Sequence, residues 1–233
     1  MRINIETFKE NLRKYYDTEA GLRNQSVKQD WKIKVRQDFL NLLKRTAKKG
    51  GGEAGFSEGK TTEQEQKQFL LELGAGAGYD SRFFMDNGLR VVAVDLSEEM
   101  VKKCKEKEIE AYQLDFYNLS ALGEKFDCIW AMNSLLHVPK ADLPHILDGI
   151  DSVLKKDGLF YMGVYGGEDF EKEYVKGEVS EAPRFFSYHL KEGLEAVLKN
   201  HFQIISFEQF EASRGAAMDV VQSVVMRKKQ EEA

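Results

Sequence analysis

The chain has 233 residues, of which 42% are hydrophobic and 31% charged, the balance of a soluble globular protein. The net charge of -5 is spread without a basic stripe, which argues against a nucleic-acid partner, and no run reaches the ~18 apolar residues of a membrane span. This length predicts one main domain with room for an appendage.

Compartment and metal content follow from the N-terminus and the cysteines. The stretch Met1–Glu6 precedes no apolar run, so no signal peptide is expected. Cys104 lies in a Lys-rich helical run and Cys128 in an apolar run, and these unrelated contexts predict neither a disulfide framework nor a metal site. We therefore expect a cytoplasmic protein, monomeric or homodimeric, that binds no metal and no membrane.

The N-terminal part differs from the rest in its pattern of apolar and charged residues. Residues 1–47 are predicted to be helical, because apolar side chains recur at roughly helical spacing between charges. Residues 48–67 are polar and Gly-rich, which predicts a flexible linker. The main domain is expected over residues 68–229, and the N-terminal helical segment is expected to act as its lid.

Short apolar runs alternate with amphipathic segments in the main domain, which predicts a parallel sheet with helices on both faces. Two later runs are separated by about a dozen residues without a helical pattern, which favours an antiparallel hairpin. The predicted strands are residues 69–73, 90–95, 110–115, 126–131, 159–165, 202–207 and 220–225. The predicted helices lie near residues 80–87, after Ser97, and near 141–154 and 190–198.

Glycines follow the first predicted strand, in the run Glu72–Gly78. At the carboxyl edge of a sheet, glycines permit a tight turn and let a ligand approach the backbone, and the next helix directs its amides at that ligand. Asp95 ends the next strand about 20 residues on, where a carboxylate can hold two ribose hydroxyls. Together these features predict a site for a nucleoside cofactor.

The glycine spacing argues against two other nucleotide sites. A dinucleotide fingerprint needs a third glycine where this chain has Tyr79. The glycine loop is also not followed by the Lys-Ser/Thr pair that a phosphate loop carries. An NAD-dependent oxidoreductase is therefore retained only as an alternative.

The chain resembles the class I S-adenosylmethionine-dependent methyltransferase family over about residues 68–227, and within it the small-molecule methyltransferases of bacterial type. The resemblance implies an α/β, Rossmann-like, doubly wound seven-stranded sheet with its last strand antiparallel, preceded by a helical N-terminal extension. The matching segments, in the family's order, are Glu72–Gly78, Val94–Asp95, Leu114–Phe116, Phe126–Asn133, Leu135–His137 and Leu154–Leu159.

The resemblance implies S-adenosylmethionine as the cofactor. The glycine loop would pass beneath its methionine part, Asp95 would hold the ribose, and Asp115 would face the adenine amino group. Met100 as plain helix core and Asp115 as a turn residue are the alternatives, and Arg36 is a further candidate for the cofactor carboxylate. The implied cofactor residues are Glu72, Gly74, Ala75, Gly76, Gly78, Asp95, Leu96, Met100, Asp115, Phe116, Ala131, Met132 and Asn133.

His137 is the best candidate for a general base, because it follows the fourth strand and an unperturbed histidine pKa of about 6.5 suits proton removal from a hydroxyl or amine. A histidine that packs or contacts the cofactor is the alternative. Acceptor-side residues are expected from the N-terminal segment and from an insert at about residues 166–188. They are Tyr16, Trp31, Tyr165, Arg184, Phe185 and Tyr188.

The fourth segment narrows the acceptor class. Enzymes that methylate exocyclic amines of nucleobases carry Asn/Asp-Pro-Pro-Tyr there, whereas this chain has Asn133–Leu136 without proline. Arg184 among aromatic residues favours a small anionic or aromatic acceptor, with core packing as the alternative. The sequence thus predicts methyl transfer to a small-molecule oxygen or nitrogen by direct in-line displacement. A non-catalytic adaptor that binds S-adenosylmethionine stays open beside the NAD-dependent oxidoreductase.

Overall fold

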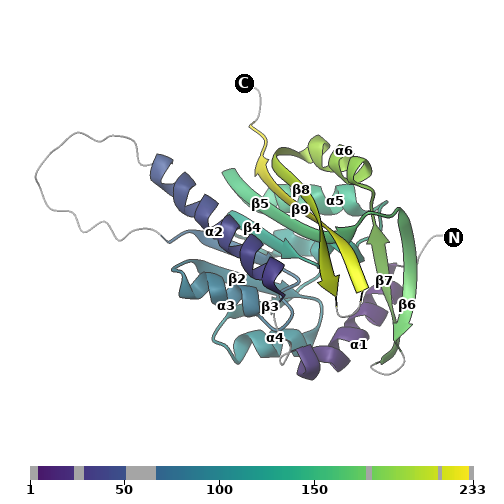
Figure 1. Ribbon diagram of the computed structural model, residues 1–233. Helices are drawn as coiled ribbons and strands as arrows, with labels where there is room; N and C mark the ends of the chain where they lie inside the picture. Colours follow the sequence, from purple (N-terminus) through teal and green to yellow (C-terminus); the bar gives the residue numbers. More distant parts are fainter. Residues whose placement is uncertain (1–4, 24–28, 51–66, 177–179, 215–216, 231–233) are drawn as a thin grey trace, which may run out of the picture.

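The computed structural model (Figure 1) describes residues 5–23, 29–50, 67–176, 180–214 and 217–230. Its strands are β1 (Phe69–Leu73), β2 (Arg90–Asp95), β3 (Glu110–Gln113), β4 (Phe126–Met132), β5 (Leu154–Gly166), β6 (Phe170–Lys176), β7 (Ser180–Tyr188), β8 (Phe202–Arg214) and β9 (Ala217–Lys228). Its helices are α1 (Ile5–Arg23), α2 (Asp30–Gly50), α3 (Tyr79–Asp86), α4 (Glu98–Lys105), α5 (Leu143–Val153) and α6 (Lys191–His201), with 3₁₀ helices η1 (Phe116–Leu122) and η2 (Leu135–His137).

A seven-stranded sheet in the order β3-β2-β1-β4-β5-β9-β8 forms the centre of the molecule. Neighbouring strands from β3 to β5 are parallel, and β9 is antiparallel to both β5 and β8. The predicted seven-stranded Rossmann-like sheet with an antiparallel last strand, and the helical N-terminal segment, are therefore confirmed. Strand order reverses between β1 and β4, so the loops after these two strands diverge and leave a crevice at their carboxyl ends.

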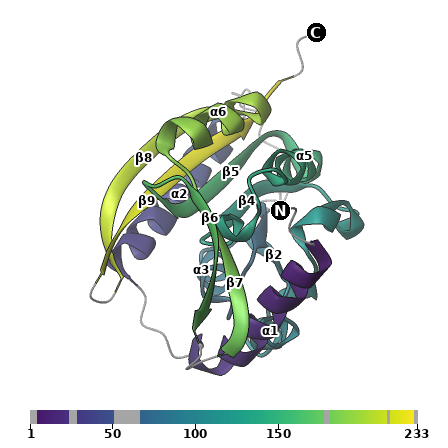
Figure 2. The same cartoon turned by 90° about the vertical axis from the view of Figure 1, so that its right-hand side faces the viewer.

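Helices cover both faces of this sheet, as Figures 1 and 2 show. Leu70 of β1 packs in the cluster formed with α2 and α3, whereas the next residue, Leu71, packs in the cluster formed with α5 and α6. All five residues of β1 are buried, the pattern expected of a parallel strand covered on both sides. The continuous apolar runs of the sequence therefore mark the middle layer of three.

Helix α2 is attached to the sheet through aromatic rings. Phe39 of α2 is 2% exposed, and its ring centroid lies 5.3 Å from that of Trp130 and 5.7 Å from that of Tyr161. Trp130 and Tyr161 stack on each other at 3.9 Å across β4 and β5. The second half of the predicted lid segment thus contributes to the core. Residues 48–50 of the predicted linker belong to α2, and residues 51–66 lie outside the described part of the chain.

The turn expected before the fifth strand is built differently from the prediction. Helix α5 ends at Val153 and β5 already begins at Leu154. The pairing with β4 then jumps from Phe126 opposite Leu154 to Cys128 opposite Leu159. Residues 155–158 are accommodated as an irregularity in the strand, with Asp157 at φ 61°. The predicted end of the helix is therefore correct to within one residue, whereas the strand begins five residues earlier than predicted.

Strands β6 and β7 pair antiparallel as a separate two-stranded sheet, which the sequence did not reveal. Their residues carry many charges and few side chains to bury, so no apolar periodicity marks them. The predicted hairpin of β8 and β9 is confirmed and extends well beyond its two apolar runs. Beyond these runs, Glu208 lies opposite Ser223 and Gln209 opposite Gln222.

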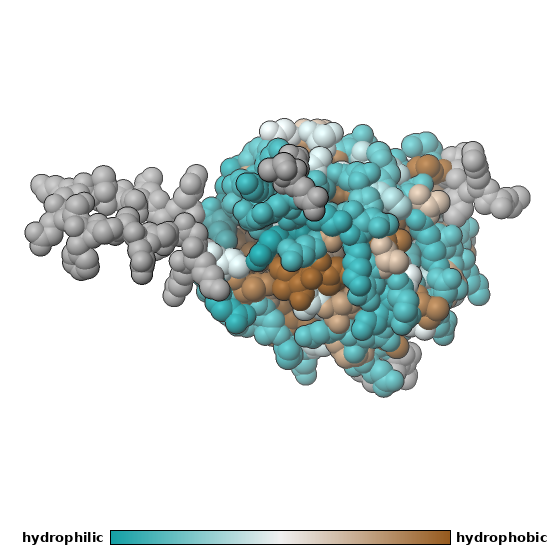
Figure 3. Space-filling view, turned by 90° about the horizontal axis from the view of Figure 1, so that it is seen from above, coloured by the Kyte–Doolittle hydropathy of each residue, from teal (hydrophilic) through white to brown (hydrophobic). Residues whose placement is uncertain are grey.

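Seen from above, Figure 3 shows a largely hydrophilic face around a hydrophobic patch near its centre. No helix in the described ranges is long and apolar enough to cross a membrane. Both cysteines are free and buried.

Replacing Phe39 tests the attachment of α2. Phe39→Ala should lower the free energy of unfolding by about 3–5 kcal/mol, because a buried ring is lost and a cavity remains beside the stacked Trp130 and Tyr161. Denaturant-induced unfolding measures this change.

The matched control lies on the same helix. Ile33 is 44% exposed, so Ile33→Ala should change the free energy of unfolding by about 0.5 kcal/mol or less. A loss below about 1 kcal/mol for Phe39→Ala would show that α2 does not contribute to the core.

Candidate functional site

A cavity of about 1440 Å³ lies at the carboxyl ends of β1, β2, β4 and β5. Helix α1 and strand β7 pack against each other beside it, as Figure 2 shows, with the rings of Phe8 and Phe185 5.3 Å apart. Ligands of open α/β sheets bind at this edge. The predicted site residues on its wall are Glu72, Gly74, Ala75, Gly76, Asp95, Leu96, Asp115, Phe116, Met132, Asn133, His137, Tyr16, Tyr165, Arg184 and Tyr188.

Five other predicted site residues lie behind the cavity wall. Met100 and Ala131 have no exposed surface, and Phe185 is 2% exposed. Trp31 packs against the ring of Tyr165, with centroids 6.4 Å apart. Direct ligand contacts for this group stay predictions. The five are Gly78, Met100, Ala131, Trp31 and Phe185.

The glycine loop has a conformation that other residues adopt at a cost. Gly74, Gly76 and Gly78 have φ of 69°, 53° and 76°. A Cβ on Gly74 would lie 2.4 Å from the Cβ of Ser134, and one on Gly78 would lie 2.6 Å from Cδ1 of Ile109. The loop is therefore pressed against the turn after β4 on one side and the start of β3 on the other.

The Asp95 carboxylate links this loop to the turn after β2. Its Oδ2 accepts a hydrogen bond from the Gly76 N–H at 2.8 Å, and its Oδ1 accepts one from the Ser97 N–H at 2.9 Å. Burial raises the pKa of Asp95, and the hydrogen bonds from Ser97 and Gly76 oppose that shift. Each carboxylate oxygen has a second lone pair, so the group can still accept hydrogen bonds from a bound ligand.

A second pair of carboxylates lies where β1 meets α3. Glu72 accepts a hydrogen bond from the Ser81 hydroxyl, and burial and then the charge of Asp80 raise its pKa well above the ordinary value. Asp80 is held by Arg36 at 2.7 Å and by the Trp130 indole N–H at 3.1 Å. Arg36, a sequence candidate for the cofactor carboxylate, is thus engaged by Asp80 and does not line the cavity.

Helix α1 crosses the cavity with charged side chains that sequence reasoning missed. Lys9 Nζ lies 3.0 Å from Oδ2 of Asp115, and Asp17 Oδ1 accepts a hydrogen bond from the Ser97 hydroxyl at 2.6 Å. One signal was available, because residues at helical spacing on α1 form a single face. That face consists of Lys9, Leu12, Tyr16, Glu19 and Arg23, all on the cavity wall.

Known proteins resemble this chain in sequence and in structure. Residues 70–158 match the sequence profile described as "Methyltransferase domain". Malonyl-[acyl-carrier protein] O-methyltransferase of Hamiltonella defensa is 42% identical over 77 residues, covering 32% of this chain and 30% of that protein. The human mitochondrial arginine-hydroxylase NDUFAF5 is 29% identical over 125 residues, covering 52% of this chain and 36% of that protein. The chain thus spans about a third of the length of these curated relatives.

Among solved structures, the 1,6-didemethyltoxoflavin-N1-methyltransferase of Burkholderia thailandensis superposes with a TM-score of 0.58. It is 24% identical, and the alignment covers 70% of this chain and 72% of that one, which supports a shared fold. Residues 70–158, which match the methyltransferase-domain profile, contain β1, apart from its first residue, and β2 to β4 of the seven-stranded sheet.

The cavity of this methyltransferase domain contains unsatisfied polar atoms. Asn133 Oδ1 and Ser134 Oγ are buried without a hydrogen-bond partner, and both residues line the wall beside the glycine loop. Buried oxygens of this kind are normally paired, so they fit the donors of a bound ligand. Together with the carboxyl groups of Asp95 and Glu72 on the same wall, these acceptor oxygens suit a cofactor that carries hydroxyl groups and positive charge.

His137 is held by two hydrogen bonds. Its Nδ1 lies 2.6 Å from the Phe185 carbonyl oxygen, which only accepts, so Nδ1 carries the proton. Its Nε2 lies 2.6 Å from the Tyr16 hydroxyl and therefore accepts that proton in the neutral ring. Burial lowers the pKa of His137 to about 3, and the charges of Arg184 and Arg23 act in the same direction. These contacts favour a positioning role over that of a general base.

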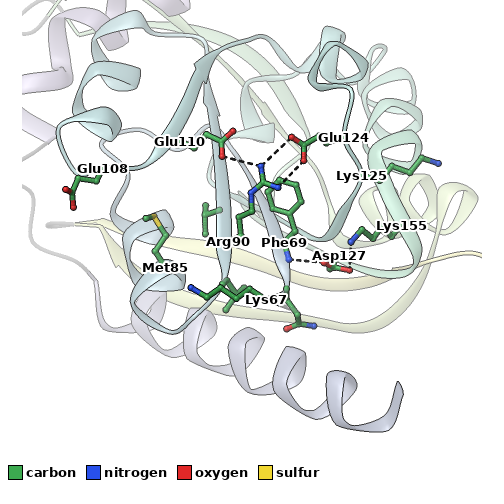
Figure 4. A pocket seen from close by; sticks show the side chains of 13 residues that line it. Lys67, Phe69, Met85, Arg90, Glu108, Glu110, Glu124, Lys125, Asp127 and Lys155 are labelled. Carbon is green, nitrogen blue, oxygen red and sulfur yellow. Dashed lines mark hydrogen bonds and ion pairs between the residues drawn. The ribbon is translucent and has the colours of Figure 1, made fainter. Parts of the chain in front are cut away.

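A second cavity of about 900 Å³ lies at the opposite, amino end of the strands (Figure 4). There the Arg90 guanidinium stands 3.9 Å from the Phe69 ring centroid and pairs with Glu110 at 3.5 Å and Glu124 at 3.4 Å. The charged groups of this cavity neutralise one another. No group of three or more His, Cys, Asp or Glu side chains in the described ranges is placed to hold a metal ion.

The state of His137 is open to a direct test. Because its folded pKa is about 3, its ring resonances in a histidine NMR spectrum should stay constant from about pH 8 to about pH 5. The unfolded chain binds the proton near pH 6.5, so the contribution of His137 to stability is present above about pH 6.5 and is lost as the pH falls toward 3.

His137→Gln identifies the resonance by its disappearance and removes this titration. A His137 signal that titrates with a midpoint near pH 6.5 would contradict the buried, neutral state.

Proposed function

We propose that the protein transfers a methyl group from S-adenosylmethionine to an oxygen or nitrogen of a small-molecule acceptor. The observation that carries the proposal is the Asp95 carboxylate at the end of β2, tied to the glycine loop at the edge of a class I fold. When bound, the cofactor supplies an electrophilic methyl group on a sulfonium, which an acceptor displaces in line with release of S-adenosylhomocysteine.

The predicted cofactor contacts are consistent with the geometry of the wall. Asp95 has lone pairs left for two ribose hydroxyls, and the glycine loop leaves its backbone open to a ligand at Gly76, where no atom lies within 4 Å of a Cβ position. The unpaired Asn133 Oδ1 and the buried Glu72 carboxyl group support the proposal that this part of the wall binds the methionine part of the cofactor. Asp115 would accept a hydrogen bond from the adenine amino group, either in place of its ion pair with Lys9 or together with it.

Relatives support a metabolite-sized acceptor. Malonyl-[acyl-carrier protein] O-methyltransferase and 1,6-didemethyltoxoflavin-N1-methyltransferase are named for methyl transfer to oxygen and to nitrogen respectively. The acceptor end of this cavity has a different chemistry from the cofactor end, because aromatic rings predominate there. They come from α1, β5 and the β6–β7 sheet, and they are Tyr16, Tyr165, Phe170, Tyr174, Phe186 and Tyr188.

Tyr16 of helix α1 and His137 form a hydrogen-bonded pair on the cavity wall. His137 holds the Tyr16 hydroxyl in one orientation, and its other nitrogen is fixed by the Phe185 carbonyl. We infer that this pair positions the acceptor, and that reactant alignment rather than proton removal by His137 supplies the rate.

Asp95→Ala tests the proposal. The variant should bind S-adenosylhomocysteine at least about tenfold more weakly in isothermal titration, since hydrogen bonds to a charged group contribute ~1.5–3 kcal/mol. With radiolabelled S-adenosylmethionine and a panel of hydroxyl and amine acceptors, the same variant should lose labelled product at sub-saturating cofactor.

Asp86→Ala is the matched control, because Asp86 lies on the exposed side of α3 and does not line the cavity. An affinity of Asp95→Ala within about threefold of wild type would refute the ribose assignment. Tight cofactor binding without transfer to any member of the panel would instead favour a non-catalytic adaptor.

A further inference from the structure

Arg184 of β7 presents a positive charge to the acceptor end of the cavity. The nearby Glu19 carboxylate feels this charge, which contributes to lowering the pKa of Glu19, but Glu19 forms its ion pair with Arg23. Arg184 is half-buried and lines the wall. Its Nε is buried and has no hydrogen-bond partner, and within the described ranges no ion pair joins its guanidinium to a carboxylate. A buried donor of a charged group is normally paired, so this arrangement leaves room for an anionic ligand.

Aromatic rings hold the guanidinium in place. Its central carbon lies 4.2 Å from the centroid of the Tyr15 ring and 5.0 Å from that of Phe186. Burial raises the pKa of Tyr16, while the charges of Arg23 and Arg184 and a hydrogen bond from Arg184 oppose that shift. Arg184 is therefore linked through Tyr16 to His137, and the guanidinium is fixed before a ligand arrives.

Two ion pairs on the cavity wall are formed by other residues. Glu19 pairs with Arg23 Nε at 2.6 Å and accepts a hydrogen bond from the Tyr15 hydroxyl. At the cofactor end, Asp115 is paired with Lys9. Arg23 and Arg184 carry two positive charges against the one negative charge of Glu19, so this group of three has a net charge of one positive unit, which suits a monoanion better than a phosphate dianion.

Building on the proposed methyl transfer, we propose that the acceptor carries a carboxylate and that Arg184 binds it as the specificity-determining residue. A guanidinium presents a planar fork of donors that matches a carboxylate through two parallel hydrogen bonds. The half-buried setting strengthens this pairing relative to water. The aromatic rings around Arg184 would then contact the body of the acceptor.

Binding of benzoate and of its neutral, equally shaped counterpart benzamide tests the proposal on the full chain with saturating S-adenosylhomocysteine. In ligand-observed NMR titrations, wild-type protein should bind benzoate at least about tenfold more tightly than benzamide. Arg184→Gln should bring the two affinities to within about twofold of each other, while Arg184→Lys should retain part of the preference.

The control variant is Lys172→Gln, which removes the same charge from the same two-stranded sheet at a position outside the cavity wall. It should leave the preference for benzoate unchanged. Equal or undetectable binding of the two probes to wild type, or a preference that survives Arg184→Gln, would overturn the proposal. Methyl transfer by wild type to the acceptor panel tests the proposed function separately. Failure of that assay with a retained preference for benzoate would leave the anion site standing, whereas transfer without any preference for benzoate would overturn the anion site alone.

Discussion

The site depends on the hydrogen bonds that the Asp95 carboxylate accepts from two backbone amides. The carboxylate lies at the end of a central strand and accepts hydrogen bonds from the backbone of the glycine loop and of the turn that starts α4. A buried carboxylate is costly unless it is paired, and here two backbone amides supply that pairing while leaving lone pairs for a ligand. The loop, the turn and the acidic group thus form one unit, and the cavity is shaped around it.

Helix α1 adds a cover whose charges are satisfied by the site itself. Lys9 pairs with Asp115, and Asp17 accepts from Ser97 at the start of α4. An adenine amino group at Asp115 would therefore share or replace the Lys9 contact. Sharing is the less costly of the two, because replacement of the Lys9 ammonium by a neutral amine would break the ion pair between two partly buried charges.

The sequence predicts the sheet, and the meeting of several candidate residues at one of its edges, for physical reasons. Strands buried on both faces appear as continuous apolar runs, and residues that follow such strands must meet at one edge. That is why Gly74, Asp95, Asp115 and Asn133 all line one cavity. The start of β5 at Leu154, five residues before the predicted strand, could not be read in the same way, because pairing between β4 and β5 absorbs residues 155–158.

The acceptor side was predicted less completely. Tyr16 and Arg184 were identified as aromatic and charged candidates. Lys9 and Asp17 lie on a helix surface where charged residues are common, and only Lys9 could have been found, from its position on the same helical face as Tyr16. Strands β6 and β7 bury little and lack an apolar period, so the two-stranded sheet that presents Arg184 could not be foreseen. The engagement of His137 by Tyr16 depends on long-range packing of α1 against β7.

The central claim concerns which nucleoside cofactor the Asp95 site accepts. Isothermal titration of the full chain with S-adenosylmethionine and with NAD⁺ tests it most directly. The account predicts binding of S-adenosylmethionine with a Kd of about 100 µM or tighter and no measurable binding of NAD⁺ at about 1 mM. Tight binding of NAD⁺ without binding of S-adenosylmethionine would contradict it.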